Sequence, residues 1–428
     1  MQTTLNREEK KIVSLAALGG MLEFYDFIIY GIFSVYFAHQ FFPSSNEYLS
    51  IIQSYGVFVL GYLARPIGGI IFSHIGDEYG RKKVLIITVT LMGIASLGIG
   101  LLPTYSHINI AAPILLLLLR LLQGLALGGE LPSTYVYISE TILTKQGLSF
   151  GIVMAGVNAG LLLGMSINQI LNSILTPEQI QIYGWRIPFI FGGILCLISY
   201  QIRKMLQETP SFQKIHDKPS FPLFYLFKNH FLQVLAGIAS TSVMSGLVVV
   251  TVVFMPTYLR EMLHLDSKTI SNNMLIVIFI NVVSIYLIGL LAQKTKPHII
   301  LRSVLILSVI FIPFCYWLMK ENHYLIYGLI ILGILEGGAA MITPLFLTYL
   351  FPTKIRLTGV ALCYNISQTL FGGMSPVMIT YFIKNGANVY FTPVFYLLII
   401  TLICAAGVTY AVKNNSALRR NSSHSHSN

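Results

Sequence analysis

Residues 111–139 read AAPILLLLLRLLQGLALGGELPSTYVYIS, a run of 29 residues in which Arg120 and Glu130 are the only charged side chains. A helix rises about 1.5 Å per residue, so roughly 20 apolar residues cross the ~30 Å hydrocarbon core of a bilayer. This stretch therefore predicts a transmembrane helix. It also predicts two ionisable groups inside the membrane, where such groups are costly and typically functional.

The composition of the whole chain agrees with a membrane protein. Of its 428 residues, 55% are hydrophobic and only 10% are charged, and the mean hydropathy is +0.74. An ordinary soluble domain carries roughly a quarter charged residues, so this composition excludes a soluble enzyme, a nucleic-acid-binding protein and a secreted module. Apolar runs of spanning length predict an all-α membrane protein with twelve transmembrane helices, at residues 12–38, 50–73, 84–103, 111–139, 147–172, 185–206, 231–259, 270–293, 298–319, 324–350, 356–383 and 390–412.

Basic residues are distributed unequally between the predicted loops. With the N-terminus placed in the cytoplasm, 20 of the 27 Lys and Arg residues fall on the cytoplasmic side and five on the outer side. This asymmetry predicts that both termini are cytoplasmic. It also explains the net charge of +11 by topology and anionic lipid, without a nucleic-acid partner. The first apolar run holds Glu23 and Asp26 and lacks a small-residue cleavage site, so we expect a retained helix instead of a signal peptide.

The longest predicted loop divides the chain into two halves. Residues 207–230 contain three prolines and read as a cytoplasmic linker between six-helix bundles at 1–206 and 231–412, followed by a disordered cytoplasmic tail at 413–428. A weak repeat supports the division, because Gly128-Gly129 recurs as Gly337-Gly338. Two pseudo-symmetric six-helix bundles around a site near the midplane are typical of secondary transporters.

The sequence shows no sign of a catalytic or metal centre. No nucleophile–base set stands out at the spans, and no metal-ligand or redox spacing is present among the four cysteines, which all fall within predicted helices: Cys196, Cys315, Cys363 and Cys404. We therefore expect no enzyme activity, no cofactor and no metal.

Two carboxyl groups in the first predicted helix are candidates for proton coupling. Glu23 and Asp26 are three residues apart and are expected to share one helical face with Tyr30, which is a candidate for substrate binding. Two carboxyl groups so close together in a poorly solvated place repel each other, so one of them can take up and release a proton during a transport cycle. The alternative is a static ion pair with Arg65 or Arg120.

The other four ionisable groups within spans have different predicted roles. Arg120 requires a negatively charged partner, which would be Glu23, Asp26 or a substrate carboxylate. Its planar guanidinium can bind a carboxylate through two hydrogen bonds. Arg65, before Pro66 in the inner half of the second predicted helix, is expected to be a structural or gate residue, and Glu130 is expected to form a gate ion pair. Glu336, beside Gly337-Gly338, is a candidate for substrate or proton binding in the second half.

The loop after the second predicted helix carries a known pattern. GDEYGRKK at residues 76–83 resembles the Gly-Asp-Arg-x-Gly-Arg-Lys signature of the major facilitator superfamily, with Glu78 where the family usually has a basic residue. An ordered set of stretches resembles its metabolite:H+ symporter branch, which includes proline/betaine, alpha-ketoglutarate, citrate and shikimate transporters. This set reads EFYDF at 23–27, RPIGG at 65–69, RLLQG at 120–124, GGE at 128–130, GWRIPF at 184–189, ETPSF at 208–212, FMPTYL at 254–259, FPT at 351–353 with Arg356 and Thr358, and FGG at 371–373 with Pro376.

The resemblance implies a twelve-helix major facilitator fold and proton-driven import by alternating access. It implies that Asp77 and Arg81 form a cytoplasmic gate with Glu140, and that the helix 1 acids and Arg120 line the central cavity. The surroundings of Glu336 look unusual for the branch, so the resemblance does not identify the substrate of this chain. The expected setting is a bacterial cytoplasmic (inner) membrane, with a monomer whose partners are protons, a small solute and the lipid bilayer.

Three functions remain to be compared. The first is a symporter that imports a small carboxylate-bearing metabolite, such as an organic acid or a zwitterionic osmolyte (proline or betaine), with protons. The second is a proton antiporter that exports a drug, metabolite or siderophore on the same fold. The third is a non-transporting membrane sensor, which would need an appended signalling domain, and the longest loop is too short to hold one.

Overall fold

The computed structural model describes residues 5–44, 47–215, 219, 221–320, 324–415 and 418, and these are built from helices. The N-terminal half contains α1 (Arg7–Phe41), α2 (Glu47–Leu63), α3 (Arg65–Tyr79), α4 (Arg81–Leu101), α5 (Tyr105–Ile108), α6 (Ala111–Thr141), α7 (Gln146–Ile174), α8 (Pro177–Gln179), η1 (Ile180–Gly184) and α9 (Arg186–Lys204). The linker forms α10 (Pro210–Gln213).

The C-terminal half repeats this pattern of long helices. It contains α11 (Pro222–Val248), η2 (Val249–Phe254), α12 (Met255–Glu261), α13 (Ser267–Ala292), α14 (Pro297–Leu318), α15 (Leu325–Thr348), η4 (Thr353–Ile355), α16 (Arg356–Ser367), η5 (Gln368–Gly373), α17 (Ser375–Lys384) and α18 (Phe391–Asn414).

Twelve spans result from these helices, as the apolar runs predicted. Ten of the described helices are long and apolar enough to cross a membrane. The other two spans are divided: α2 and α3 are separated by Ala64 just before Pro66, and α16 and α17 are joined through the π-helical turn η5. Proline lacks the N–H that a helix interior requires, so the division at Pro66 follows from the sequence.

Two predicted boundaries are wrong. Residues 76–79 were expected in a loop, but they form the last turn of α3, and only Gly80 separates α3 from α4. Gly80 has φ +112°, a backbone conformation that glycine adopts without strain. The last nine residues of the expected linker, 222–230, already belong to α11.

Most of the predicted disordered tail at 413–428 lies outside the described residues, but its predicted start is wrong because the last helix continues past residue 412. Of this range, α18 includes Lys413 and Asn414. Lys218, Arg419 and Arg420, which entered the charge count, also lie outside the described residues.

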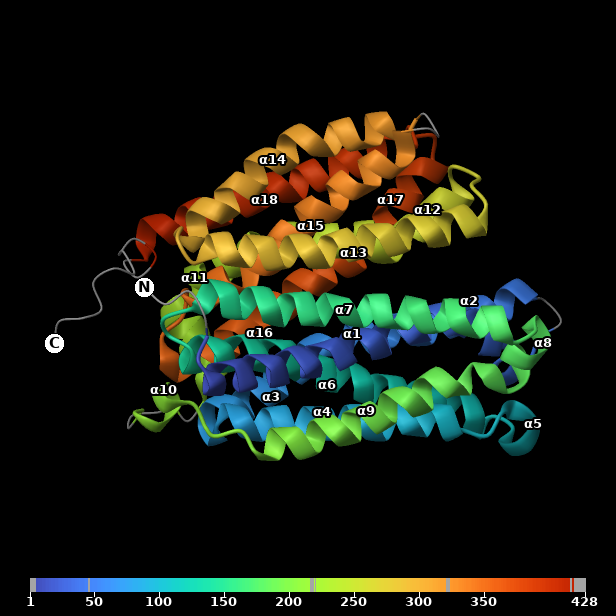
Figure 1. The fold of residues 1–428 in the computed structure, drawn as a ribbon, viewed down its shortest axis with the longest axis horizontal. Helices are drawn as coiled ribbons and strands as arrows, with labels where there is room; N and C mark the ends of the chain where they lie inside the picture. The colour runs from blue at the N-terminus through green and yellow to red at the C-terminus, as the bar shows by residue number, and fades with distance from the viewer. Residues whose placement is uncertain are drawn as a thin grey trace.

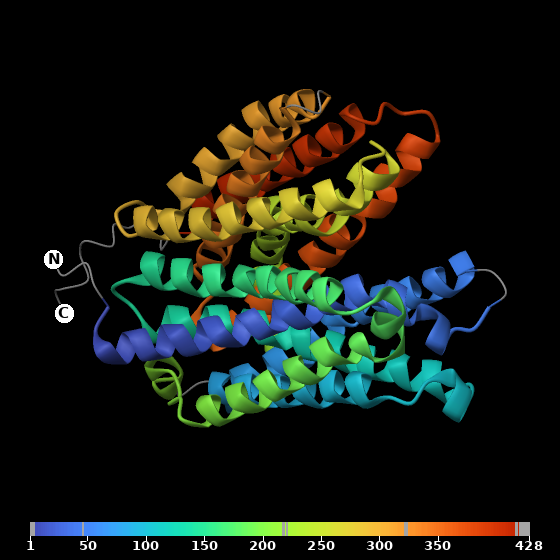
Figure 2. The ribbon, with the colours of Figure 1, turned by 45° about the vertical axis from the view of Figure 1, so that its right-hand side comes forward.

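The two halves lie side by side along their length (Figure 1). In the N-terminal half α1 packs on α7, and α4 packs on α6 and α9; in the C-terminal half α11 packs on α18, and α15 packs on α13 and α14. The halves meet where α7 contacts α13 and where α3 contacts α16. Figure 2 shows the same pairing of α7 with α13 after the molecule is turned.

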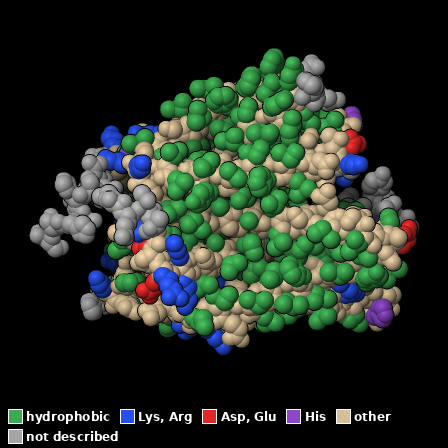
Figure 3. Space-filling model, in the orientation of Figure 1, with side chains coloured by type: hydrophobic (Ala, Val, Ile, Leu, Met, Phe, Trp, Pro, Cys, Tyr) green, Lys and Arg blue, Asp and Glu red, His purple; other side chains and the backbone are tan. Residues whose placement is uncertain are grey.

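Charge and apolar surface are separated along the long axis. α1 begins and α18 ends at the same end of the molecule, which we call the terminal end (Figure 1). Lys and Arg side chains gather at the terminal end, whereas hydrophobic side chains cover the flank of both halves (Figure 3). Exposed Leu, Ile, Val and Phe on α6, α9, α13 and α14 contribute to this apolar surface, which fits a hydrocarbon environment.

Candidate functional site

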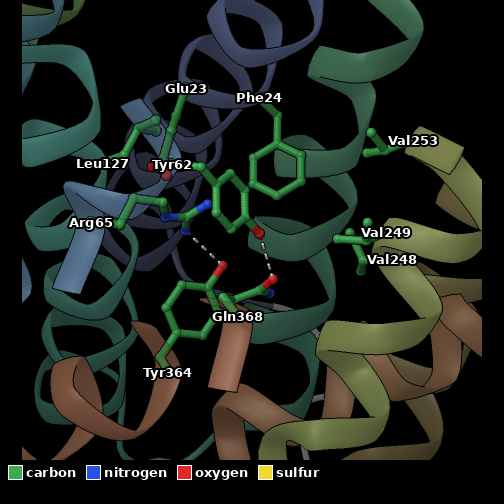
Figure 4. A pocket seen from close by; sticks show the side chains of 10 residues that line it. All are labelled: Glu23, Phe24, Tyr62, Arg65, Leu127, Val248, Val249, Val253, Tyr364 and Gln368. Carbon is green, nitrogen blue, oxygen red and sulfur yellow. Dashed lines mark hydrogen bonds between the residues drawn. The ribbon is translucent and has the colours of Figure 1, made fainter. Parts of the chain in front are cut away.

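A small cavity lies between the two halves, and side chains from both line it (Figure 4). The N-terminal half contributes α1, α2, α3 and α6, and the C-terminal half contributes α11, η2, α16 and η5. The lining residues are Glu23, Phe24, Tyr62, Arg65, Leu127, Val248, Val249, Val253, Tyr364 and Gln368. The cavity thus combines one carboxyl group, one guanidinium, an amide and three aromatic rings with apolar walls.

Glu23 is the acid of this cavity. Its side chain is 2% exposed, and neither carboxyl oxygen has a hydrogen-bond partner among the described residues. A buried carboxylate without such partners is costly. The group is therefore suited to take up a proton or to meet a cationic part of a bound solute.

Arg65 supplies the positive charge of the cavity and links the two halves. Its Nη2 donates to Tyr364 Oη at 3.5 Å, and its guanidinium carbon lies 5.0 Å from the ring centre of Tyr62 and 5.6 Å from that of Tyr364. Tyr62 Oη in turn donates to Gln368 Oε1 at 3.1 Å. The expected placement of Arg65 in the cytoplasmic gate is thereby corrected, because the side chain faces the central cavity.

Asp26 faces away from the cavity. It accepts a hydrogen bond from Ser96 of α4, and the backbone of Gly192 in α9 packs against its other oxygen. The resemblance implied that both acids of the first helix line the central cavity, and Asp26 does not line the described one. Three residues correspond to about 60° around a helix, which is enough here to place one acid in the cavity and the other inside the N-terminal half.

Arg120 and Tyr30 belong to the same interior network as Asp26. Arg120 Nη1 donates to Gln123 Oε1 at 2.7 Å, and Gln123 Nε2 donates to Ser96 Oγ at 2.9 Å. The Arg120 guanidinium carbon lies 4.0 Å from the ring centre of Tyr30. Arg120, Tyr30 and Glu336 do not line the described cavity, so its walls do not carry the substrate contacts that were predicted for these three residues.

Glu130 forms an ion pair, but not one that joins the halves. Its partner is Arg203 at the end of α9, and it also accepts a hydrogen bond from Thr88 of α4. Arg203 Nη1 donates to the Leu85 carbonyl at 2.7 Å. All these groups belong to the N-terminal half, so the predicted gate role of Glu130 is corrected to a contact within one bundle.

Three other predicted residues do meet at the terminal end. Arg81 lies between two acids, with Nη2 3.2 Å from Asp77 Oδ1 and Nε 3.0 Å from Glu140 Oε2. Glu140 Oε1 accepts from Arg356 Nη1 of the other half at 3.1 Å. We call Asp77, Arg81, Glu140 and Arg356 the terminal network.

Further hydrogen bonds join the terminal network to the C-terminal half. Asp77 Oδ2 accepts from the Thr358 N–H at 2.8 Å and from Thr358 Oγ1 at 2.7 Å. Arg81 Nη2 donates to the Thr353 carbonyl at 2.8 Å. In this conformation the halves are therefore held together at the terminal end.

The linker also docks on the terminal network, which the sequence reasoning did not anticipate. Glu208 accepts hydrogen bonds from the N–H groups of Arg81 and Lys82, each at 3.1 Å. Thr209 Oγ1 donates to Glu140 Oε2 at 2.8 Å, and the Phe212 ring lies 4.6 Å from the Arg81 guanidinium. In the sequence, only the family-like stretch ETPSF pointed to this segment. No spacing of residues within it indicated that it contacts the terminal network.

The described residues offer no site for a metal ion, since no three His, Cys, Asp or Glu side chains among them are grouped closely enough to hold one.

The profile described as Major Facilitator Superfamily matches residues 16–376. The chain belongs to the major facilitator superfamily.

Similar proteins of this superfamily are named as transporters. A putative proline/betaine transporter of Staphylococcus haemolyticus is 33% identical over 405 residues, which covers 92% of this chain and 86% of that protein. The glycine betaine/proline/ectoine/pipecolic acid transporter OusA of Dickeya dadantii is 30% identical, covering 92% and 81%. The proline/betaine transporter of Salmonella typhimurium is 29% identical, covering 92% and 81%. These relatives agree with the metabolite:H+ symporter branch.

Solved structures confirm the major facilitator fold. The proton:xylose symporter XylE bound to 6-bromo-6-deoxy-D-glucose superimposes with a TM-score of 0.76 at 17% identity, covering 95% of each chain. The inward open form of XylE from E. coli gives 0.66 at 16% identity, covering 92% of this chain and 95% of that one. The protein is thus a multi-pass membrane transporter and not an enzyme.

Proposed function

We propose that the protein is a proton-coupled symporter that imports a small solute with a carboxylate, of the proline and betaine class. The observation that carries this proposal is the presence of Glu23 and Arg65 in one buried cavity lined by both halves. The proline/betaine transporters that resemble the chain over 92% of its length support the same solute class.

The cavity chemistry fits a zwitterion. The Arg65 fork can bind a carboxylate through two hydrogen bonds, if it exchanges its present contact with Tyr364 Oη for the solute. A quaternary or secondary ammonium group is attracted to aromatic faces, which Phe24, Tyr62 and Tyr364 supply. This assignment replaces Arg120 by Arg65 as the carboxylate-binding residue.

Glu23 is the proposed proton-binding residue of the cavity. A proton from external water would neutralise it when the cavity faces outward, and cytoplasmic water would receive the proton when the cavity faces inward. Proton and solute binding drive transport only if both are bound more favourably in states that lead inward. A neutral Glu23 no longer attracts the Arg65 guanidinium, which would leave Arg65 available to the solute carboxylate, so proton binding and solute binding would favour each other.

Asp26 and Arg120 have a supporting role in this proposal. Arg120 is 3% exposed and Asp26 is 1% exposed, and the two are connected through Gln123 and Ser96. A buried guanidinium needs a counter-charge. We therefore assign Asp26 as the acid that balances Arg120 and holds α1, α4 and α6 together behind the cavity.

Alternating access would occur by rocking of the N-terminal bundle and of the C-terminal bundle, which begins with α11, about the cavity, with residues 207–221 as their cytoplasmic linker. The concentration of Lys and Arg at the terminal end supports placing this end, and both termini, in the cytoplasm. The conformation described here would then be closed on the cytoplasmic side. A monomer in a bacterial inner membrane, without a nucleic-acid partner, completes the proposal.

Uptake of labelled glycine betaine or proline into proteoliposomes tests this function. An inward proton gradient should drive accumulation of one of the two solutes, since each pH unit supplies about a tenfold ratio per coupled proton. Glu23→Gln should lower the accumulation ratio about tenfold per pH unit, and the exposed-site variant Arg260→Gln should retain the wild-type ratio. Uptake of both solutes that is indifferent to the gradient would refute the symport proposal.

The antiport alternative predicts the opposite direction. Solute loaded inside the vesicles would then leave faster when the outside is made acidic, and cells lacking the protein would accumulate more solute. Lower solute accumulation in such cells supports import.

A further inference from the structure

A second acid lies buried in the C-terminal half, outside the cavity. Glu336 of α15 is 0% exposed. Its Oε2 accepts a hydrogen bond from Asn281 Nδ2 of α13, whereas its Oε1 has no partner among the described residues. Asn281 Nδ2 also donates to the Gly333 carbonyl at 2.9 Å, which fixes the amide in place.

Close packing of α13 against α15 encloses this carboxyl group. A Cβ at Gly337 would lie 3.1 Å from the Asn281 carbonyl oxygen, and a Cβ at Gly333 would lie 3.0 Å from Val277 Cγ1. Ser284 is buried beside them and donates to the Asn281 carbonyl at 2.8 Å. The small residues of α15 therefore bring the two helices together and exclude water from Glu336.

Among the described residues, no opposite charge balances Glu336. The elements packed against α15 are α6, α7, α11, α13, α14, α16 and η2, and within the described residues none of them turns a charged or titratable side chain toward the carboxyl group. α7 carries no Asp, Glu, Lys or Arg, and α13 carries only Lys268, thirteen residues from Asn281. An unpaired carboxylate is costly in such a place, so the neutral acid is the form that this conformation accommodates.

A permanently neutral group would not require glutamate. Glutamine has the same shape and could accept the same hydrogen bond from Asn281 without any cost of ionisation. Glutamate can do what glutamine cannot only if the carboxyl group loses its proton at another stage of the cycle. α13 forms both the wall of this site and the contact with α7 of the other half, so rearrangement of the halves is the event that can admit water.

We propose that Glu336 is a second proton-binding site, located in the C-terminal half and separate from Glu23, so that two protons accompany each solute. The inference rests on the proposed symport. In each cycle external water protonates the Glu336 carboxylate in one conformation, and the O–H bond breaks to release the proton to cytoplasmic water in the other. The Asn281 amide remains as a donor that stabilises the carboxylate after release.

The proton-to-solute ratio tests this inference. In proteoliposomes with the membrane potential clamped at zero, the glycine betaine or proline ratio at which net flux reverses should be about a hundredfold for a gradient of about one pH unit, against about tenfold for a single coupled proton. Glu336→Gln and Glu23→Gln should each lower the ratio about tenfold, and the double variant should show no accumulation. Thr343→Val, two turns along α15 at another buried position, should keep the wild-type ratio.

The outcomes separate the two proposals. A wild-type ratio near tenfold, or an unchanged hundredfold ratio in Glu336→Gln, overturns the second site and leaves symport intact, whereas insensitivity to the gradient overturns symport itself. If Glu336→Gln does not fold, infrared spectra of the wild type and of Asn281→Ala decide the matter. A protonated carboxyl band that shifts in Asn281→Ala supports a neutral Glu336, and a missing band contradicts it.

Discussion

Arg356 of α16 donates a hydrogen bond across the interface between the halves to Glu140 of α6, with 3.1 Å between Nη1 and Oε1. The other oxygen of Glu140 lies 3.0 Å from Arg81 Nε. One buried carboxylate is thus shared between a guanidinium of its own half and one of the opposite half. This sharing makes Arg356 the charged side chain through which the C-terminal half joins the terminal network.

Arg356→Gln is expected to favour opening at the terminal end. A hydrogen bond between charged groups contributes about 1.5–3 kcal/mol, so its loss should shift the ratio of open to closed molecules roughly ten- to a hundredfold. Distances between spin labels on exposed positions at the terminal ends of α3 and α13 measure this ratio. Arg302→Gln, at an exposed position of α14, is the matched control, and unchanged label distances in Arg356→Gln would show that the ion pair does not hold the gate.

Glu208→Gln is expected to loosen the linker. The Glu208 carboxylate accepts the first N–H groups of α4, at Arg81 and Lys82, and an acid at a helix N-terminus contributes about 0.3–1 kcal/mol. Amide hydrogen exchange at these two residues should therefore be roughly two- to fivefold faster in the variant. Gln213→Ala, at an exposed position of the same linker, should leave exchange at Arg81 and Lys82 unaltered. Equal protection in Glu208→Gln would contradict the assigned contact.

The sequence was sufficient to predict the spans and part of the terminal network. Long apolar runs are decisive because a bilayer requires about 20 such residues in a helix, and the division of the second span follows from Pro66. Asp77, Arg81 and Glu140 could be predicted together because the resemblance supplied their pattern. Arg356, though present among the quoted residues, could not be paired with Glu140 because their contact joins positions 216 apart in the chain.

The direction of each buried side chain could not be predicted. Glu23 and Asp26 are close in sequence, yet one faces the cavity and the other faces Ser96. Arg65 was expected to be a structural or gate residue from its position before Pro66 in the second span, whereas its contact with Tyr364 depends on where the C-terminal half lies. The direction of such a side chain depends on how the helices pack against each other. The periodicity of residues within one helix does not specify that packing.

Arg65→Gln is expected to weaken solute binding. Removing a charged partner of a carboxylate costs about 1.5–3 kcal/mol, so the KM for glycine betaine or proline should rise at least about tenfold. Arg65→Lys retains the charge but lacks the planar fork and should give an intermediate KM. Arg260→Gln, which removes an arginine from an exposed ion pair with Glu261, should leave KM unchanged. A wild-type KM in Arg65→Gln would exclude Arg65 from solute binding.

Gly289→Ala is expected to separate α7 from α13 and to destabilise the described conformation. A Cβ at Gly289 would lie 2.5 Å from Gly151 Cα and 3.0 Å from the Gly147 carbonyl oxygen, and backbone atoms cannot move aside as a side chain can. Alanine in place of a helical glycine otherwise stabilises by about 0.5–1 kcal/mol. Gly31→Ala isolates this gain, because a Cβ at Gly31 meets nothing within 4 Å. Thermal unfolding in detergent should therefore occur at a lower temperature in Gly289→Ala and at an equal or higher temperature in Gly31→Ala. If both variants unfold at a higher temperature than the wild type, the halves are not in close contact at Gly151 and Gly289.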